Sequence, residues 1–534
     1  MSRVLVVSLD GYERSIEEEM IAGGHLPALA RLRKRSARFL LDHGSALRTG
    51  LGAEHVSSGL SPVSGNRWSA LDFDKDRYEV VQEGPKFCPF ASVMSAKTVV
   101  FDLPYFDLQR APNVQGISAW GAHDAGTELS SSPVGLVAQV LQRFGHYPAE
   151  HSLYTIAWPS EEKCRLVGNE LVRGVELRTE IASWLLNERV PNWNLALIGV
   201  SEAHSVLEAL WHGYDTRHPL HCHHSGPTAK LGVVNVYKAI DRLVDRLASE
   251  FDDAEIVIFS MHGMGANTSD VPSMVLLPEL LYRHAFSKPF FEQPSSWTNA
   301  VDGVPILGST ENWHVETKQI ETGRHSPYAL IGRFVPPRLK RNVKRAFRIE
   351  DEPVLSERRR SVQWMPAARY RRAWPRMHAF ALPSYYDGRV RINLKGRERN
   401  GLVPLDKYED ICSEITTLVS NCKNPISGQG VVESIDCGHP AQALDLDASA
   451  ADMTIVWKGT SLAFDHPTLG KIGPVPFRRV GGHTGPFGMA YIAADRIKVG
   501  DRGTRSSFDV VPTLFDLLDE PLPHGLSGRS LLEI

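Results

Sequence analysis

The chain has 534 residues, of which 42% are hydrophobic and 23% are charged, and its formal net charge is -3 at pH 7. This composition is typical of a globular protein long enough for two or more domains, and the near-neutral charge gives no reason to expect a nucleic acid polymer as a partner. The first residues have no basic-then-apolar leader, no run is apolar enough to cross a membrane, and the six cysteines are scattered. We therefore expect a cytoplasmic protein without a membrane partner. The sequence does not indicate an oligomeric state.

Short apolar runs alternate along the chain with longer amphipathic stretches. Several of these runs end directly before polar or ionisable residues. Continuous apolar strands that alternate with helices are typical of the α/β class, in which a mostly parallel sheet is covered by helices on both faces. The expected strands are Val4–Leu9, Leu195–Val200, Glu255–Phe259 and Met489–Ala494, and the expected helices are Lys163–Leu186, Val233–Phe251 and Phe508–Leu518.

Two segments interrupt this alternation. Residues 64–124 are rich in glycine, proline, serine and aromatic residues, and residues 286–376 combine little strand signal with a dense basic run. Both are expected to be insertions beside the sheet. The predicted organisation is an N-terminal part of the core at 1–285, a basic insertion or cap at 286–376 and a C-terminal part of the core at 377–534. The basic insertion either steers an anionic substrate or is a solvated surface.

Ionisable side chains follow three of the predicted strands. Asp10 follows the first strand, Glu202 and His204 follow the second, and His262 follows the third. Ligands of open parallel sheets bind beyond the carboxyl ends of the strands, so these residues are expected to meet at one edge. Asp10 taken alone is equally typical of a turn. His483 lies among close glycines that would allow backbone to approach a ligand.

The residues after the second strand have the spacing of a metal-binding helix face. His204, Glu208 and His212 are four residues apart, and a helix would therefore place them on one side. Imidazole and carboxylate ligands suit zinc first, with manganese or iron as alternatives. The alternative is an amphipathic helix with ordinary polar positions.

Thr49 is the candidate nucleophile. It can begin a helix that extends to about Ser58, and a helix N-terminus favours an anion such as phosphate. A threonine hydroxyl attacks only when a base or a metal lowers its pKa. Thr49 could equally be an N-cap residue.

A second histidine cluster lies further along the chain, at His218, His221, His223 and His224 around Cys222. Its residue types suit a metal. It follows no predicted strand, however, so a polar connecting loop is the preferred interpretation, and a place at the rim of the pocket is a further alternative.

The order of these motifs resembles the alkaline phosphatase superfamily, in particular its type I phosphodiesterase/nucleotide pyrophosphatase-like branch. The resemblance rests on Val-Ser-Leu-Asp-Gly-Tyr around Asp10, on the leucine-rich segment Leu26–Leu32, and on Thr49 about ten residues before Ser-Gly-Leu-Ser-Pro. The C-terminal segments that begin at Asp509 and Gly528 also resemble that family. The segment Arg391–Arg397 resembles one in phosphohydrolase/phosphomutase members.

The resemblance implies an alkaline-phosphatase-like fold with one or two divalent ions. One ion would be held by Asp10, Thr49, His262 and an aspartate before that histidine, but this sequence has Met261 at the aspartate position. The other ion would be held by His204, Glu208 and His483. Because a thioether is a poor ligand for a hard ion, Glu202 is hypothesised to supply the missing charge.

The implied function is a metal-dependent phosphohydrolase, phosphodiesterase- or nucleotide-pyrophosphatase-like, that acts on a small anionic phosphoester. It would proceed through a phospho-threonine intermediate on Thr49. The alternatives are a phosphotransferase or phosphomutase, or a degenerate non-catalytic metal-binding member of the superfamily.

Overall fold

The computed structural model describes residues 3–121, 127–149, 160–292, 303–307, 313–321 and 359–533. The chain divides into two compact units. The first consists of residues 1–70, 84–267 and 479–534, and the second of residues 71–83 and 268–478. Among the described helices, none combines the length and the hydropathy needed to cross a lipid bilayer.

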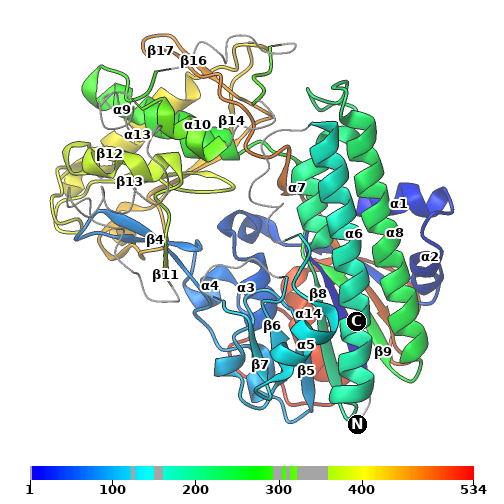
Figure 1. Ribbon diagram of the computed structural model, residues 1–534. Coiled ribbons are helices and arrows are strands. Elements are labelled where there is room, and N and C mark those ends of the chain that lie inside the picture. The colour runs from blue at the N-terminus through cyan, green and yellow to red at the C-terminus, as the bar shows by residue number, and fades with distance from the viewer. Residues whose placement is uncertain are drawn as a thin grey trace, which may run out of the picture. The chain divides into compact units, whose positions relative to one another are not determined.

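The first unit is built on a nine-stranded mixed sheet in the order β20-β2-β19-β9-β1-β8-β5-β6-β7 (Figure 1). Its central strands β9, β1, β8, β5 and β6 are parallel, whereas β19 is antiparallel to both of its neighbours. The strands are β1 (Val4–Leu9), β2 (Ala37–Asp42), β5 (Thr98–Phe101), β6 (Gln115–Ser118), β7 (Ser130–Ser132), β8 (Leu195–Val200), β9 (Glu255–Ser260), β19 (Phe487–Ala493) and β20 (Gly500–Ser506).

The register aligns the ends of the central strands. Val4 is paired with Leu195 on one side and with Glu255 on the other, so the three strands start together. Leu9 is paired with Val200 at the opposite end. The residues that follow β1, β8 and β9 therefore emerge at the same edge of the sheet, as the sequence predicted.

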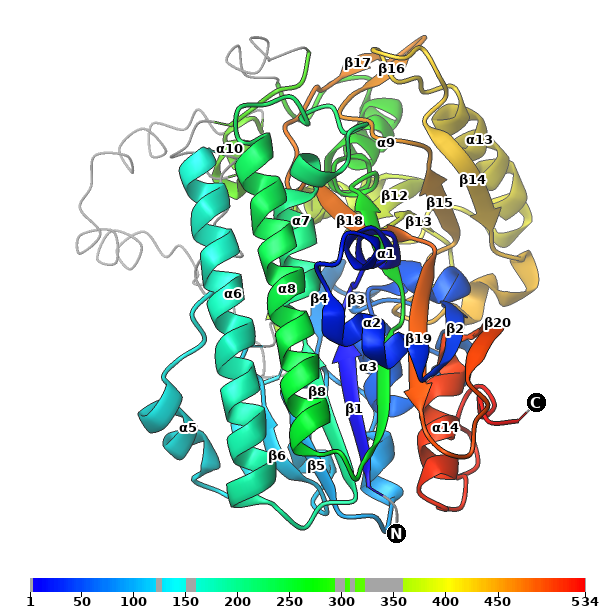
Figure 2. The same ribbon diagram turned by 90° about the vertical axis from the view of Figure 1, so that its right-hand side faces the viewer.

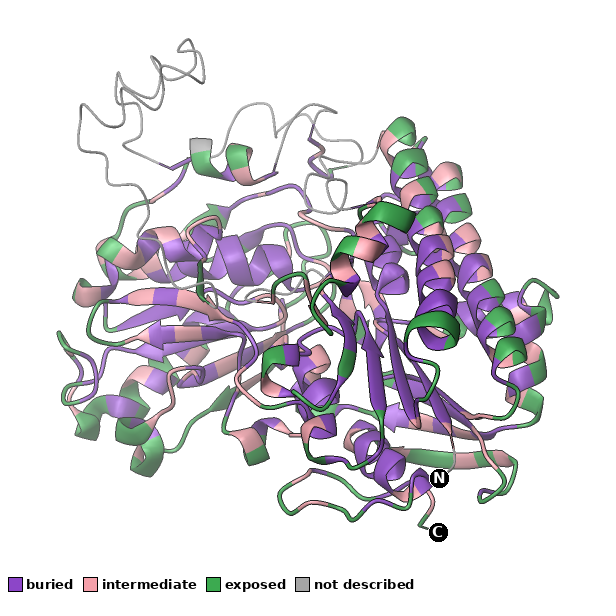
Figure 3. Ribbon diagram, turned by 60° about the horizontal axis from the view of Figure 1, so that its bottom comes forward, coloured by how far each residue is buried: buried purple, intermediate pink, exposed green. Residues whose placement is uncertain are grey.

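Helices cover both faces of this sheet. Long helices α6 and α8 run along one face, and α14 packs on the other with β1, β8 and β9 in one apolar core (Figures 1 and 2). The outer sides of α6 and α8 are exposed while the inner sides are buried (Figure 3). The helices of the unit are α1 (Arg14–Ala22), α2 (Pro27–Lys34), α3 (Gly52–Ser58), α4 (Pro62–Gly65), α5 (Leu136–Phe144), α6 (Glu161–Trp184), α7 (Glu202–Tyr214), α8 (Gly226–Glu250) and α14 (Val510–Leu517).

Residues 64–124 are not an insertion beside the sheet, which corrects the sequence prediction. They supply β5 and β6, two fully paired strands of the central sheet. Each of these strands has only four residues, too few to show a period between glycine- and proline-rich turns. Residues 71–83 of the same segment form β3 (Leu71–Asp74) and β4 (Glu79–Glu83), which belong to the second unit.

The second unit also differs from the predicted boundaries, because residues 377–478 belong to it and not to the core. It contains a four-stranded antiparallel sheet in the order β12-β13-β15-β14 and a three-stranded sheet β11-β4-β3. Most of the basic run, including Arg338–Arg345, lies outside the described residues. The remaining elements here include α9 (Leu277–Phe286), α10 (Trp313–Gln319), β11 (Arg359–Ser361), β12 (Ala379–Leu382), β13 (Gly388–Ile392), α13 (Tyr408–Ser420), β14 (Val432–Cys437), β15 (Met453–Trp457), β16 (Phe464–His466) and β17 (Gly470–Ile472).

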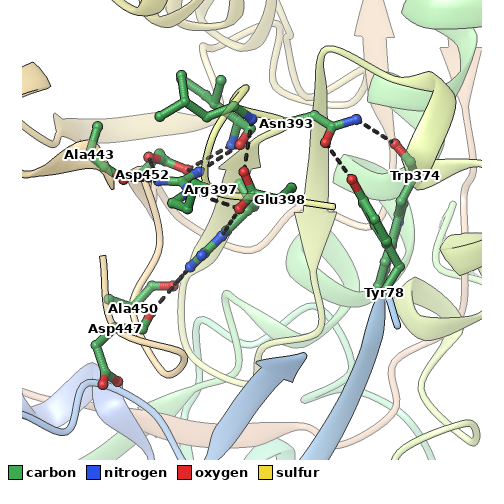
Figure 4. Close-up of polar contacts among 12 residues, drawn as sticks. Tyr78, Trp374, Asn393, Arg397, Glu398, Ala443, Asp447, Ala450 and Asp452 are labelled. Carbon is green, nitrogen blue, oxygen red and sulfur yellow. Dashed lines mark hydrogen bonds and ion pairs between the residues drawn. The ribbon is translucent and has the colours of Figure 1, made fainter. Parts of the chain in front are cut away.

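Buried ion pairs hold the segment Arg391–Arg397 in place (Figure 4). Arg397 donates to Glu398 Oε1 at 2.8 Å and to Asp452 Oδ2 at 2.6 Å, and all three side chains are buried. Arg391 donates to the same Glu398 oxygen at 2.8 Å. Since these charges satisfy each other inside the second unit, the arginines of this segment have a structural role.

Candidate metal centre

The turn after β1 supports the first turn of α7. The Nδ1 atom of His204 lies 2.9 Å from Asp10 Oδ2, and the His204 backbone N–H donates to the Asp10 carbonyl at 3.1 Å. Gly11 has a φ of +56°, and a Cβ atom there would lie 2.9 Å from the Cβ of His204. A glycine is therefore required at position 11, where the turn after β1 closely approaches the first turn of α7.

Three side chains converge beside this turn. The Nε2 atom of His204 lies 3.2 Å from Glu208 Oε1 and 2.9 Å from His483 Nε2. Together, one ligand atom from each of these residues lies within 4.8 Å of the others. His483 is carried by β18 (Gly481–Gly485), which pairs antiparallel with β10 (Gly263–Ala266) directly after His262. Among the described residues this is the one group of three such ligands.

The donor set fits a divalent ion. Asp10 accepts from Nδ1 of His204, so that Nδ1 carries the proton and Nε2 presents its lone pair to the cluster. Two nitrogens bound to one zinc at tetrahedral angles lie about 3.3 Å apart, close to the separations in this cluster. Two imidazoles and one carboxylate are a known catalytic zinc set that leaves a fourth position open. Asp10 contacts one of these three residues, His204, and is not among the three residues of the group.

Arg479 fixes the orientation of Glu208. Its guanidinium forms an ion pair with Glu208 Oε2, while Oε1 is the oxygen near His204. The Val480 backbone N–H also donates to the Glu208 carbonyl at 3.1 Å. The carboxylate therefore faces the cluster with one oxygen and the arginine with the other.

His262 stands next to the cluster. Its ring centroid is 4.5 Å from that of His483, and its Nδ1 lies 2.9 Å from the Gly263 carbonyl oxygen. A Cβ atom on Gly52 would lie 3.6 Å from His262 Nε2, so this ring faces the start of α3. Burial lowers the pKa of His262, which favours the neutral imidazole.

Thr49 is the last residue of the 3-10 helix η1 (Gly44–Thr49), not the start of α3. Gly50 has a φ of +71°, and this left-handed residue ends η1 before α3 begins. Thr49 Oγ1 donates to the Ala46 carbonyl at 2.8 Å and accepts from the Leu51 N–H at 3.2 Å. The predicted helix that begins at Thr49 is thus wrong in its first residues, and the hydroxyl caps a turn.

The sequence matches no family model and no curated protein. Among solved structures, the alkaline phosphatase PafA superimposes with a TM-score of 0.52 at 11% identity, over 100% of this chain and 99% of that chain. This chain has the fold of the alkaline phosphatase superfamily. More distant similarities are to phosphonoacetate hydrolase from Sinorhizobium meliloti 1021 (TM-score 0.48, 14% identity, 97% of this chain and 95% of that chain) and to murine ectonucleotide pyrophosphatase/phosphodiesterase 5 (0.48, 10%, 99% and 98%).

Within this alkaline phosphatase fold, Glu202 does not join the cluster. Its carboxylate accepts from Arg178 Nη2 at 3.0 Å and from Arg178 Nε at 3.2 Å. Arg178 also donates to Asp102 Oδ2 at 2.7 Å, and all three side chains are fully buried. The hypothesis that Glu202 replaces the missing aspartate is therefore corrected: its charge neutralises an arginine.

The candidate histidines between His212 and His224 lie outside the cluster. His212 is fully buried with its Nε2 at 3.1 Å from Ser225 Oγ. His221 and His223 contact the His212 carbonyl and the Ser225 hydroxyl, respectively. In the part of the chain that the structure describes, this segment forms no group of three ligands, so the connecting-loop interpretation fits it better.

Two arginines that form ion pairs with predicted site residues were not predicted from the sequence. Arg178 occupies the apolar face of α6, in step with Leu171, Val175 and Ile181. A charge at such a position signals a buried partner, and this signal was available. Arg479 stands four residues before His483, but only the fold brings it to Glu208.

Proposed function

We propose that this protein is a metal-dependent hydrolase of phosphoric esters that acts on a small anionic substrate. The observation that carries the proposal is the convergence of His204, Glu208 and His483 at the carboxyl edge of an alkaline phosphatase fold. Zinc is the ion that two imidazoles and a carboxylate suit best, with manganese or iron as alternatives. A bound ion would withdraw charge from the phosphoryl oxygens.

The chain's own residues supply the rest of the proposed chemistry. Asp10 keeps the proton of His204 on Nδ1, and Arg479 keeps one oxygen of Glu208 turned to the cluster. Thr49 Oγ1 is the proposed nucleophile. It bonds to phosphorus as the bond between phosphorus and the ester oxygen breaks, and the hydroxyl proton passes to that departing oxygen, which leaves as the alcohol. Water then attacks the phospho-threonine, which releases phosphate, or the phosphomonoester of a diester, and restores the hydroxyl.

Turnover of p-nitrophenyl phosphate and bis-p-nitrophenyl phosphate, with zinc, manganese or iron(II), tests this proposal. Thr49→Ala is expected to lower kcat by about 10³-fold or more. Thr179→Ala is the matched control, because Thr179 is also buried and also donates to a backbone carbonyl, that of Val175. Activity that survives in Thr49→Ala would show that Thr49 is not the nucleophile.

The same assay separates the alternatives. A phosphotransferase or phosphomutase would move the phosphoryl group to an added alcohol or sugar in preference to water. A non-catalytic member would retain its ion and turn over neither ester with any of the three metals. A bound ion together with metal-dependent release of p-nitrophenol is the result that we expect.

A further inference from the structure

The position before His262 lies in an apolar environment. Met261 is 7% exposed and belongs to the same apolar core as Phe259, Val510 and Val511. An enclosed void beside it measures about 10 Å³, enough for one water molecule at most. His55 and Phe508 also line this void. Among the described residues, no carboxylate lines this void, although the family resemblance places a metal-binding aspartate at position 261.

The other groups expected at a second ion are already engaged. Asp10 Oδ2 accepts from His204, and Thr49 Oγ1 both donates to Ala46 and accepts from Leu51. The hydroxyl of Ser260 accepts from the Tyr12 N–H at 3.2 Å and donates to the His262 carbonyl at 2.8 Å. A second ion would therefore have to displace existing hydrogen bonds.

Glu13 is a second carboxylate whose charge acts on His262, together with Asp10. Its Oε2 accepts from the Met264 N–H at 2.9 Å, and its Oε1 accepts from the Ser15 N–H at 3.1 Å. This side chain therefore caps α1 and holds β10, and it does not supply the charge that Met261 lacks. A dication needs paired negative charge when it is buried.

We propose that this protein holds one metal ion, bound by His204, Glu208 and His483, and that Met261 removes the second ion position of the fold. The residues around His262 do not fit a second dication, because Asp10 is engaged by His204 and Glu13 is engaged by the backbone N–H groups of Met264 and Ser15. The inference rests on the metal site of the proposed function but not on turnover.

Zinc stoichiometry tests the inference directly. Each protein is saturated with Zn²⁺, freed of excess ion by gel filtration, and measured for zinc per chain by elemental analysis. We expect one ion in the wild type, one in Met261→Leu, one in His262→Gln and none in His483→Gln. A two-ion centre would instead give two in the wild type and one in each of the two histidine variants, which would overturn the inference.

Met261→Asp is the complementary variant and is expected to raise the count from one toward two. If the buried carboxylate prevents folding, as circular dichroism would show, the two histidine variants still decide. An ion that survives His483→Gln but is lost in His262→Gln would also overturn the inference. One bound ion without turnover of either ester would contradict the proposed hydrolase alone, whereas turnover with two bound ions would contradict the single-ion centre alone.

Discussion

The Nε2 atom of His43 and the Nδ1 atom of His55 lie 3.0 Å apart, and both rings are buried. The other ring nitrogen of His43 lies 2.6 Å from the hydroxyl of Ser507. His43 precedes η1 and His55 belongs to α3, so this contact joins the two ends of the segment that carries Thr49. The histidine pair therefore holds together the two ends of the segment from His43 to His55, which carries the candidate nucleophile Thr49.

Removal of one ring should destabilise the first unit. His43→Ala leaves the Nδ1 of His55 and the hydroxyl of Ser507 without this buried partner and also creates a cavity. We expect the free energy of unfolding to fall by about 3 kcal/mol. Urea denaturation followed by circular dichroism measures the loss. His25→Ala, at an exposed histidine, should change the midpoint little, and an equal loss there would contradict the role of the pair.

Acid should destabilise the protein through the same rings. Burial lowers the pKa of His55 to about 3 and that of His43 well below its ordinary value, so the unfolded chain binds protons that the folded chain does not. Stability is therefore fully present above about pH 6.5 and is lost as the pH falls toward 3. For His55 the loss between pH 6.5 and 5 is about 2 kcal/mol.

Urea midpoints at pH 7.5, 6 and 5, in EDTA so that ion release does not contribute, measure this dependence. His55→Asn should show a shallower decline over this range than the wild type. Parallel declines in the two proteins would show that His55 does not titrate in this way.

The sequence predicted best the strands that are continuous apolar runs, because such runs fit only the buried interior of the sheet. Val4–Leu9 and Leu195–Val200 are continuous runs of six buried residues, and both have the predicted bounds. β5 has only four residues, which is too short for a periodic signal. Residues 71–83 belong to the second unit, where β4 pairs with β11. The sequence could not show this pairing because the two strands are far apart along the chain.

Helical spacing predicted part of the metal centre. His204 and Glu208 are one turn apart and do meet, whereas His212 is two turns from His204, about 12 Å along the axis, and is too far away to share its ion. Sequence spacing alone cannot show which oxygen or nitrogen each ligand presents. That depends on the contacts of Asp10 and Arg479, which exist only in the folded chain.

The buried charges around Arg178 should be sensitive to substitution. Arg178→Met leaves the carboxylates of Asp102 and Glu202 buried without their guanidinium, and the free energy of unfolding should fall by about 3–5 kcal/mol. Arg173→Met on the same helix removes only exposed ion pairs, with Glu176 and Glu180, and should cost at most about 1 kcal/mol. Similar urea midpoints for the two variants would argue against a buried charge cluster.

Asp10 gives the sharpest test of how the ligands are oriented. Asp10→Asn keeps the shape of the side chain but replaces the charged acceptor of His204 Nδ1 with a neutral amide. If Asp10 orients His204, zinc affinity should fall about 10–100-fold while one ion still binds at saturation. Competition with a chromophoric chelator measures the affinity, and Asp252→Asn, at an exposed aspartate, is the control. Complete loss of the ion at saturating zinc would instead identify Asp10 as a direct ligand, because an orienting residue changes affinity without changing the number of sites.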